Sequence, residues 1–176
     1  TDSDASIVVD GTTLTVTPED DYNGSFTVDV FVTDGSVSVS TSFSVTVSPV
    51  NDTPVLSDLS DDSIDEDGIY TLTLSALDVD EDDLTYFAQV DGNSSASVDG
   101  STLTVTPDAD FYGNILVSIT VSDGQASDSG SFTLTVNAVN DAPVISSIVD
   151  QTINEDGSLI LELSATDVDL DVLTFT

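Results

Sequence analysis

Hydrophobic and polar residues alternate along most of this chain. The alternation is clearest in TLTLSAL (71–77), STLTVTP (101–107), ILVSITVSD (115–123) and SFTLTVN (131–137). Successive side chains of a strand point to opposite faces, so a period of two predicts half-buried β-strands. No segment has the period of an amphipathic helix. The pattern therefore predicts an all-β protein.

Turn residues separate the alternating segments. Asp91-Gly92, Asp99-Gly100 and Asp123-Gly124 are typical of tight connections between strands. About seven short strands in roughly 90 residues favour an immunoglobulin-like β-sandwich. We expect the inward positions to form its core: Leu72, Leu74, Leu103, Val105, Ile119, Val121, Phe132 and Leu134.

The sequence repeats itself at a constant spacing. DGTTLTVTPEDDYNG at 10–24 returns 89 positions later as DGSTLTVTPDADFYG at 99–113, and residues 32–55 return at 121–144 without insertion or deletion. A constant spacing predicts one structural unit copied in tandem. We expect the C-terminal part of a first repeat at 1–50, a complete repeat at 51–139 and the N-terminal part of a third repeat at 140–176.

Both terminal parts are predicted to be incomplete sandwiches. Half a sandwich cannot bury its inner faces, so we interpret the chain as an excerpt from a longer array. A second hypothesis is that residues 140–176 of one subunit complete residues 1–50 of the next, because the two segments together have nearly the length of one repeat. That arrangement would produce a strand-complemented extracellular filament.

The composition narrows the possible partners. The 176 residues include 34 Asp or Glu and no Lys, Arg or His, for a formal net charge of -34. Without basic side chains there is no patch that could neutralise nucleic acid phosphates or an anionic membrane surface. No stretch approaches the roughly 20 apolar residues of a membrane helix. We therefore predict no nucleic acid partner and no membrane insertion.

The chain also lacks the usual catalytic groups. Without His, Cys or Lys it cannot form a Ser-His-Asp triad, a thiolate nucleophile or a Schiff base. Carboxylate pairs remain, but a glycosidase uses one pair in one cleft, whereas these acids recur with the repeat. The prediction is that the chain is not an enzyme.

The densest acidic segment contains five acids in six positions, from Asp78 to Asp83. Five carboxylates this close repel one another unless a positive charge lies among them. In an extended segment alternate residues share a side, so Asp78, Asp80 and Asp82 should converge while Glu81 and Asp83 face away.

The third repeat separates the two sets of acids. It retains Asp167, Asp169 and Asp171, but has Leu170 and Val172 at the alternate positions. Carboxylate and amide oxygens without His or Cys suit calcium, which takes six to eight oxygen ligands, better than zinc or copper. Magnesium is less well suited because it retains its water ligands. Calcium is therefore the predicted cofactor.

Several of these motifs together carry a family resemblance. ITVSDG at 119–124 is followed by VNDAPV at 139–144, NEDG at 154–157 and ATDVDLD at 165–171. This order resembles the cadherin fold, and more closely the bacterial cadherin-like repeats of large surface adhesins and secreted repeat proteins. The resemblance covers the whole chain. It implies tandem Greek-key β-sandwiches outside the cell, with calcium at the junctions between repeats.

The resemblance also implies a ligand set for each junction. The linker differs from that of animal cadherins, because Pro49 and Ala138 replace its first Asp and one residue is missing before the proline. One or two ions per junction are therefore expected. The first junction would use Glu19, Asp21, Asn51, Asp52, Asp78, Asp80 and Asp123. The second would use Glu66, Asp108, Asp110, Asn140, Asp141, Asp167 and Asp169.

The resemblance implies that the chain is a stiff extender or fibre segment of a bacterial cell-surface adhesin. Its implied partners are calcium ions, neighbouring repeats and like molecules in a fibre. A glycan-binding or homophilic module is the alternative, with Tyr22, Phe111 and Tyr112 as its candidate aromatics, although we favour their interpretation as plugs at the sandwich end. Halophilic adaptation would instead spread acids over all surfaces.

Asp123 has a second interpretation, as a hairpin-turn residue. Isolated acids are expected to be solvated: Asp2, Asp4, Asp61 and Asp128.

Overall fold

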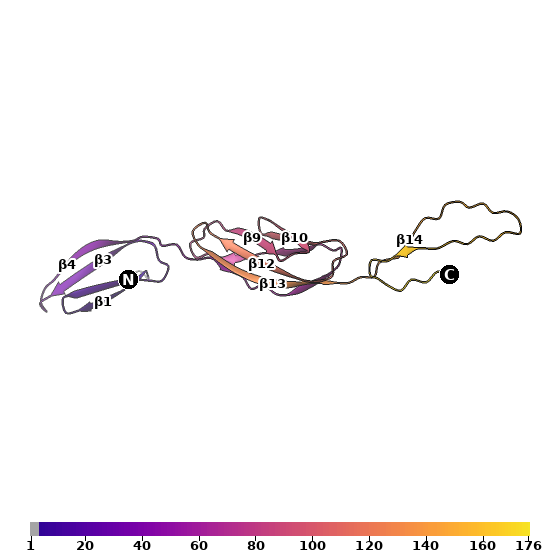
Figure 1. The fold of residues 1–176 in the computed structure, drawn as a ribbon. Helices are drawn as coiled ribbons and strands as arrows, with labels where there is room; N and C mark the ends of the chain where they lie inside the picture. Colours follow the sequence, from indigo (N-terminus) through magenta and orange to yellow (C-terminus); the bar gives the residue numbers. More distant parts are fainter. Residues whose placement is uncertain (1–3) are drawn as a thin grey trace.

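The computed structural model describes residues 4–176, and every regular element in that range is a β-strand. The fold is all-β, as the alternating pattern predicts. Three parts follow one another along an extended molecule, with two hairpins at the N-terminal end, a sandwich in the centre and an open segment at the C-terminal end (Figure 1). No helix in the described part is long and apolar enough to cross a membrane.

The central sandwich contains nine strands in two main sheets, more than the seven expected. One sheet has the order β6-β13-β12-β9 and the other β10-β11-β7, while β5 and β8 pair separately. The strands are β5 (Val55–Leu56), β6 (Asp62–Asp65), β7 (Tyr70–Thr73), β8 (Ala76–Leu77), β9 (Thr85–Val90), β10 (Ser94–Asp99), β11 (Thr102–Pro107), β12 (Gly113–Ser122) and β13 (Ser127–Asn137).

The core lies between these two sheets. Alternate residues of β12 and β13 point inward, and Leu103, Ile119 and Leu134 have no exposed surface. The rings of Tyr70 and Phe132 meet across the sheets with a centroid separation of 5.8 Å. The predicted core is confirmed, except that Leu72 is only partly buried against it.

The segment 71–77 differs from the single strand that its alternation predicts. It forms β7 and β8, which belong to different sheets. Between them, the N–H of Leu74 donates to the carbonyl of Ser101, and the carbonyl of Ser75 accepts from Ser57. Residues 71–77 therefore change their pairing partner from β11 to β5. The alternation of polar and apolar residues continues through this change, so the sequence pattern does not reveal it.

The N-terminal hairpins have the same strand registers as the last four strands of the central sandwich. β1 (Ala5–Asp10) pairs with β2 (Thr13–Pro18), and β3 (Gly24–Thr33) pairs with β4 (Ser38–Val47). Among the described residues no further strand covers them, and their apolar faces are largely open. Phe43, for example, is 43% exposed.

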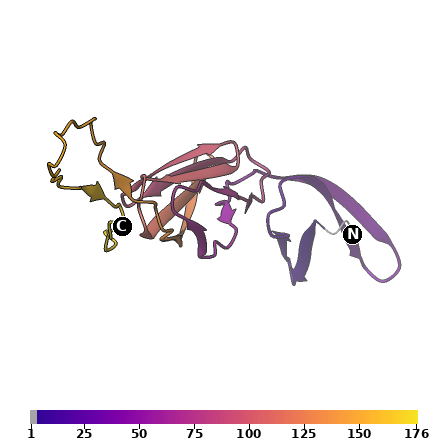
Figure 2. The ribbon, with the colours of Figure 1, turned by 90° about the vertical axis from the view of Figure 1, so that its right-hand side faces the viewer.

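The C-terminal segment contains only one pair of strands, β14 (Val144–Ile145) with β15 (Ala165–Thr166). The residues between these two strands form a long open loop (Figure 2). Apolar side chains of this loop are exposed, including Leu161 at 42%. The boundaries of the three repeats stay a prediction.

Two acids expected to be solvated have structural roles instead. Oδ2 of Asp128 accepts a 2.8 Å hydrogen bond from the N–H of Leu56, and Oδ1 of Asp61 accepts one of 2.7 Å from Thr133. The first bond attaches β5 to β13 and the second attaches the loop after β5 to β13, because carboxylates can satisfy N–H groups that strand pairing leaves free. Asp2 lies outside the described residues.

Candidate metal centre

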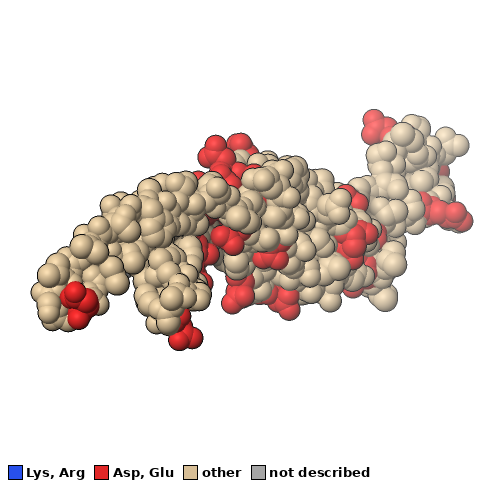
Figure 3. All heavy atoms as spheres, turned by 90° about the vertical axis from the view of Figure 1, so that its left-hand side faces the viewer, with Lys and Arg blue, Asp and Glu red and all other residues tan. Residues whose placement is uncertain are grey.

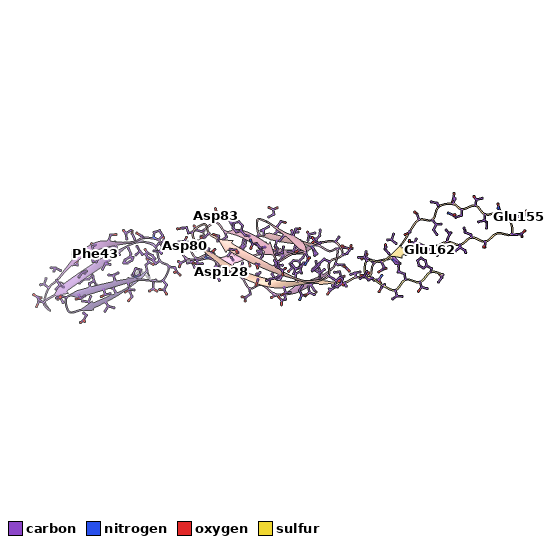
Figure 4. All side chains as sticks on the ribbon, in the orientation of Figure 1. Phe43, Asp80, Asp83, Asp128, Glu155 and Glu162 are labelled. Carbon is purple, nitrogen blue, oxygen red and sulfur yellow. The ribbon has the colours of Figure 1, made fainter. Side chains whose placement is uncertain are left out.

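Carboxylates converge at the end of the central sandwich that faces the N-terminal hairpins. One oxygen from each of Asp78, Asp80 and Asp82 lies within 4.8 Å of the others. Figure 4 shows Asp80 at this end, with Asp83 beside it on the acidic loop. The structure thus brings together the three alternate acids that the sequence pattern selects.

The local geometry is nevertheless a turn, so the expectation of an extended segment was wrong. Residues 78–84 form no strand, and Glu81 has a positive φ of 59°. Oδ1 of Asp78 accepts from the N–H of Asp80 at 2.9 Å and from that of Asp82 at 3.5 Å. A carboxylate that holds the following backbone in this way favours a turn, and the turn places the three acids on one side.

Asp78 is the buried member of this cluster. Its side chain is 8% exposed, and its Oδ2 is buried without any hydrogen-bond partner. A buried carboxylate oxygen without a partner is unfavourable, because burial removes its hydration without replacing it. This oxygen belongs to a cluster of carboxylates, a position where a cation would satisfy it.

The linker preceding the sandwich contacts the same cluster. The N–H of Asp52 donates to Oδ2 of Asp80 at 2.7 Å, and Nδ2 of Asn51 donates to Oδ2 of Asp123 at 2.9 Å. Nδ2 of Asn51 also donates to the carbonyl of Asp52. Asp52 is therefore held against the acidic loop by its backbone, and Asn51 is held against the turn between β12 and β13 by its side chain.

Asp123 combines the two roles that its sequence position suggests. Its Oδ1 accepts from the N–H groups of Gln125 and Ala126, each at 2.6 Å, so it shapes the hairpin turn, while its Oδ2 faces Asn51. The hydrogen bonds from Ala126, Asn51 and Gln125 lower the pKa of Asp123. It therefore remains ionised beside the linker.

The first junction also contains acids from the N-terminal hairpins. Glu19, Asp21, Asp52 and Asp80 line one hollow of about 260 Å³. Partial desolvation, followed by the charges of Asp21 and Asp80, raises the pKa of Asp52. Desolvation and the charges of Asp78 and Asp80 likewise raise the pKa of Asp82. Ionised acids at this junction are therefore electrostatically strained.

A second cluster lies at the opposite end of the central sandwich. Oxygens of Glu66, Asp141 and Asp169 lie within 4.8 Å of one another. Glu66 is 8% exposed, and its Oε1 accepts from the N–H of Val139 in the linker. The N–H of Asp141 donates to Oδ2 of Asp169 at 2.6 Å. This cluster unites a sandwich residue, a linker residue and a residue of the third predicted repeat.

Further acids surround Asp141. Desolvation and the charges of Asp110, Asp169, Glu66 and Asp67 raise its pKa. Asp67 was not among the predicted ligands, although its Oδ1 accepts from the N–H of Asp110 at 3.3 Å. The recurrence of IDEDG as INEDG was the sequence signal that could have identified it.

The remaining predicted ligands have different positions. Asn140, Asp141 and Asp167 line a hollow of about 410 Å³, and Nδ2 of Asn140 donates to the carbonyl of Asp141. Asp108 has a backbone role, since its N–H donates to Asn93 and its carbonyl accepts from Phe111. No described contact places the Asp108 carboxylate in the cluster.

The aromatic residues of the adjoining loops fit the role of plugs. Phe111 packs against the buried core cluster, and the ring of Tyr22 lies 5.8 Å from that of Phe26. Gly113, which follows these aromatic residues, has a φ of 135°, a backbone conformation that favours glycine. Only Tyr112 is largely exposed, at 61%.

Acidic side chains are also found away from the junctions. Figure 3 shows them over the visible face of the molecule, with no basic residue among them. What distinguishes the junction clusters is convergence, together with a nearly buried carboxylate in each, Asp78 in one and Glu66 in the other. The donors are all oxygens, so the arrangement suits a hard divalent cation.

Comparison with known proteins identifies the domain type. Residues 51–137 match the family model of the bacterial Ig domain, and no curated protein matches the chain. The extracellular cadherin domains 1–5 of protocadherin gamma B2 are 18% identical, with a TM-score of 0.54, covering 93% of this chain and 37% of theirs. Domains 1–3 of mouse protocadherin-24 are 15% identical, with a TM-score of 0.53, covering 93% and 63%.

These similarities concern the fold alone. The chain spans 25% of the length of an endo-fucoidan hydrolase from glycoside hydrolase family 107, which is 19% identical with a TM-score of 0.41 and covers 82% of this chain. That weak match carries no argument about activity. Together, the family match and the cadherin structures show an immunoglobulin-like, cadherin-like repeat.

Proposed function

Given that residues 51–137 match the bacterial Ig domain model and have a cadherin-like fold, we propose that the chain is a calcium-rigidified structural segment of an extracellular adhesin. The observation that carries the proposal is the buried Oδ2 of Asp78, which has no hydrogen-bond partner within a cluster of three carboxylates. Calcium would supply positive charge to this cluster. The chain's own residues supply oxygens and position the linker.

The stiffening follows from the residues that each cluster connects. Asp52 and Asp141 belong to linkers, and each donates its N–H to an acid of the repeat that follows. Their raised pKa values reflect desolvation and neighbouring negative charge from both sides of the linker. Without a cation this repulsion favours separation of the repeats, and with calcium the same charges favour a fixed junction.

Millimolar calcium outside cells would suit a switch of this kind, because extracellular modules bind calcium at about 10⁻⁴ to 10⁻³ M. The proposal therefore includes a cell-surface or secreted location. It assigns the chain no catalytic role, and its partners are calcium and adjoining repeats.

The test is thermal unfolding of the chain in chelator, in calcium and in sodium chloride of the same ionic strength. We expect a rise in Tm that is specific to calcium. The variant Asp80→Asn with Asp82→Asn should lose most of that rise. Its matched control, Glu81→Gln with Asp83→Asn, removes the same charge from the same loop and should retain it.

Two results would contradict the proposal. If sodium chloride raised the Tm as much as calcium does, the acids would act through general screening alone. If the control lost the calcium effect to the same extent as Asp80→Asn with Asp82→Asn, total charge and not the Asp78 cluster would be responsible. Small-angle scattering with and without calcium then measures whether the molecule becomes more extended and rigid.

A further inference from the structure

The two edges of the four-stranded sheet in the central sandwich differ in charge. β6, at one edge, has Asp62 and Asp65 among its residues. β9, at the opposite edge, has the sequence TYFAQV and contains no charged residue. Charged side chains on an edge strand discourage pairing with another chain. β6 therefore has this protection and β9 does not.

β9 has backbone groups available for a further strand. In the described part of the chain β12 is its only strand partner. Alternate residues of an edge strand direct their N–H and C=O groups away from the sheet. An extended peptide can therefore pair with β9 along about 20 Å, since each strand residue advances by about 3.3 Å.

A hollow of about 600 Å³ lies beside β9. It extends to β10, and Ser118 and Thr120 of β12 also line it. None of its lining residues is charged, whereas four other hollows of the described structure each include at least one Asp. In a chain with 34 acids this hollow is a neutral surface.

This surface offers apolar groups to both faces of an added strand. Phe87 is 57% exposed on the outer face of the sheet, opposite Thr120. On the inner face, Ala88 and Val98 are only partly buried against the core. Because successive side chains of a strand point to opposite faces, one set from an added strand would contact Phe87 and the other would contact Ala88 and Val98.

Acids lie at both ends of the neutral edge. Asp83 lies two positions before β9, on the acidic loop, and Asp91 directly follows β9 (Figure 4). Oδ1 of Asp91 accepts a 3.0 Å hydrogen bond from the N–H of Leu116, which holds this carboxylate at the end of the strand. The complement of this charge pattern is a segment with basic residues on both sides of an apolar centre.

We propose that β9 binds such a segment of another protein by strand addition. The partner is not a second copy, because this chain contains no Lys or Arg. The field of the acidic chain attracts the basic ends, while the backbone of β9 and the neutral hollow determine register and side-chain preference. All the residues involved belong to the central sandwich, so binding depends neither on the terminal segments nor on the proposed calcium sites.

Titration calorimetry with a synthetic peptide tests the proposal. The probe is Lys-Lys-Val-Thr-Val-Thr-Val-Lys-Lys with blocked ends, titrated into the full chain in calcium and in chelator. We expect saturable binding in both, weaker at higher sodium chloride concentration. A control peptide of the same composition, Val-Thr-Lys-Lys-Val-Lys-Lys-Thr-Val, should bind about tenfold more weakly or less. No saturable binding of the probe, or equal affinity of the two peptides, would overturn the proposal.

Variants of the chain test the place of binding. Phe87→Lys puts a positive charge at the centre of the edge and should lower the affinity for the probe about tenfold. Thr135→Lys is the matched control, because it adds the same charge at an exposed position of β13, a strand with partners on both sides. Circular dichroism checks that both variants are folded. Equal affinities of the two variants would exclude the β9 edge as the site.

Hydrogen exchange followed by nuclear magnetic resonance tests the mode of binding. Strand addition should slow exchange at alternate amides of β9, because only those N–H groups face the added strand. Slowed exchange in residues 78–83 without any in β9 would show that the lysines bind the acidic loop alone. That result would overturn the proposal while leaving the calcium sites untouched.

Discussion

The N–H of Asp52 lies 2.7 Å from Oδ2 of Asp80, which connects the linker to the acidic loop of the following sandwich. The equivalent pair at the second junction, Asp141 and Asp169, has a separation of 2.6 Å. Each bond gives one carboxylate two roles, since its acceptor oxygen positions the backbone while its charge contributes to the cluster. The two roles can be separated by substitution.

The change Asp80→Asn should separate them. The asparagine oxygen can still accept from Asp52, and one like charge is removed from the cluster, so stability in chelator should be retained or rise slightly. Calcium affinity should fall about tenfold or more, equivalent to about 1.4 kcal/mol. Asp80→Ala removes the acceptor as well and should lower stability in chelator by about 1 kcal/mol. Calcium titration calorimetry and chemical unfolding measure the two effects. Equal behaviour of the two variants would contradict separate roles.

Glu66→Gln should weaken calcium binding at the second junction alone. The glutamine oxygen can continue to accept from Val139, but the buried negative charge is lost. We expect one class of sites to lose about tenfold in affinity. Glu162→Gln is the control, because Glu162 lies on the open C-terminal loop, away from both clusters (Figure 4). A comparable loss in that control would exclude a specific role for Glu66.

The pH dependence in chelator should have an unusual sign. The pKa values of Asp52, Asp82 and Asp141 are raised above 3.8 by desolvation and neighbouring charge, so the folded state binds their protons more tightly than the unfolded state. The contribution of these three groups to the free energy of unfolding should therefore rise as pH falls from neutrality toward 3.8. Asp34 and Asp123 have lowered pKa values and lose their stabilising effect only at lower pH.

Calcium should reverse this trend, because protons compete with the ion for the same oxygens. The measurement is Tm against pH between about 4 and 7, in chelator and in calcium, with the linkage slope evaluated in each. Asp141→Asn should flatten the slope in chelator. An unchanged slope in that variant would remove Asp141 as a contributor.

The difference between the closed sandwich and the open hairpins should be visible in core substitutions. Phe132→Ala should destabilise the central sandwich by about 3 to 5 kcal/mol, since it removes a buried ring that contacts Tyr70. Phe43→Ala, in the open hairpins, should leave that transition within about 0.5 kcal/mol of the unmodified chain. Chemical unfolding followed by tyrosine fluorescence measures both. Similar losses would show that the parts unfold as one unit.

The sequence by itself determined the all-β class, the core of the central sandwich and the convergence of Asp78, Asp80 and Asp82. Alternation identifies inward positions such as Ile119 and Leu134 because strand side chains point alternately to opposite faces. The third repeat has Leu170 at the position that Glu81 occupies in the second. This difference distinguished Glu81 from the acids that converge on one side of the loop, Asp78, Asp80 and Asp82.

Only the tertiary structure decided how those acids meet. The alternation in residues 78–83 suggested an extended strand, whereas the convergence comes from a turn in which Asp78 accepts backbone N–H groups. The contacts of Asp67 with Asp110, and of Asp128 with Leu56, join residues far apart in the sequence. Local pattern cannot reveal such pairs, because hydrogen bonds between segments far apart in the sequence depend on how the sheets pack against each other.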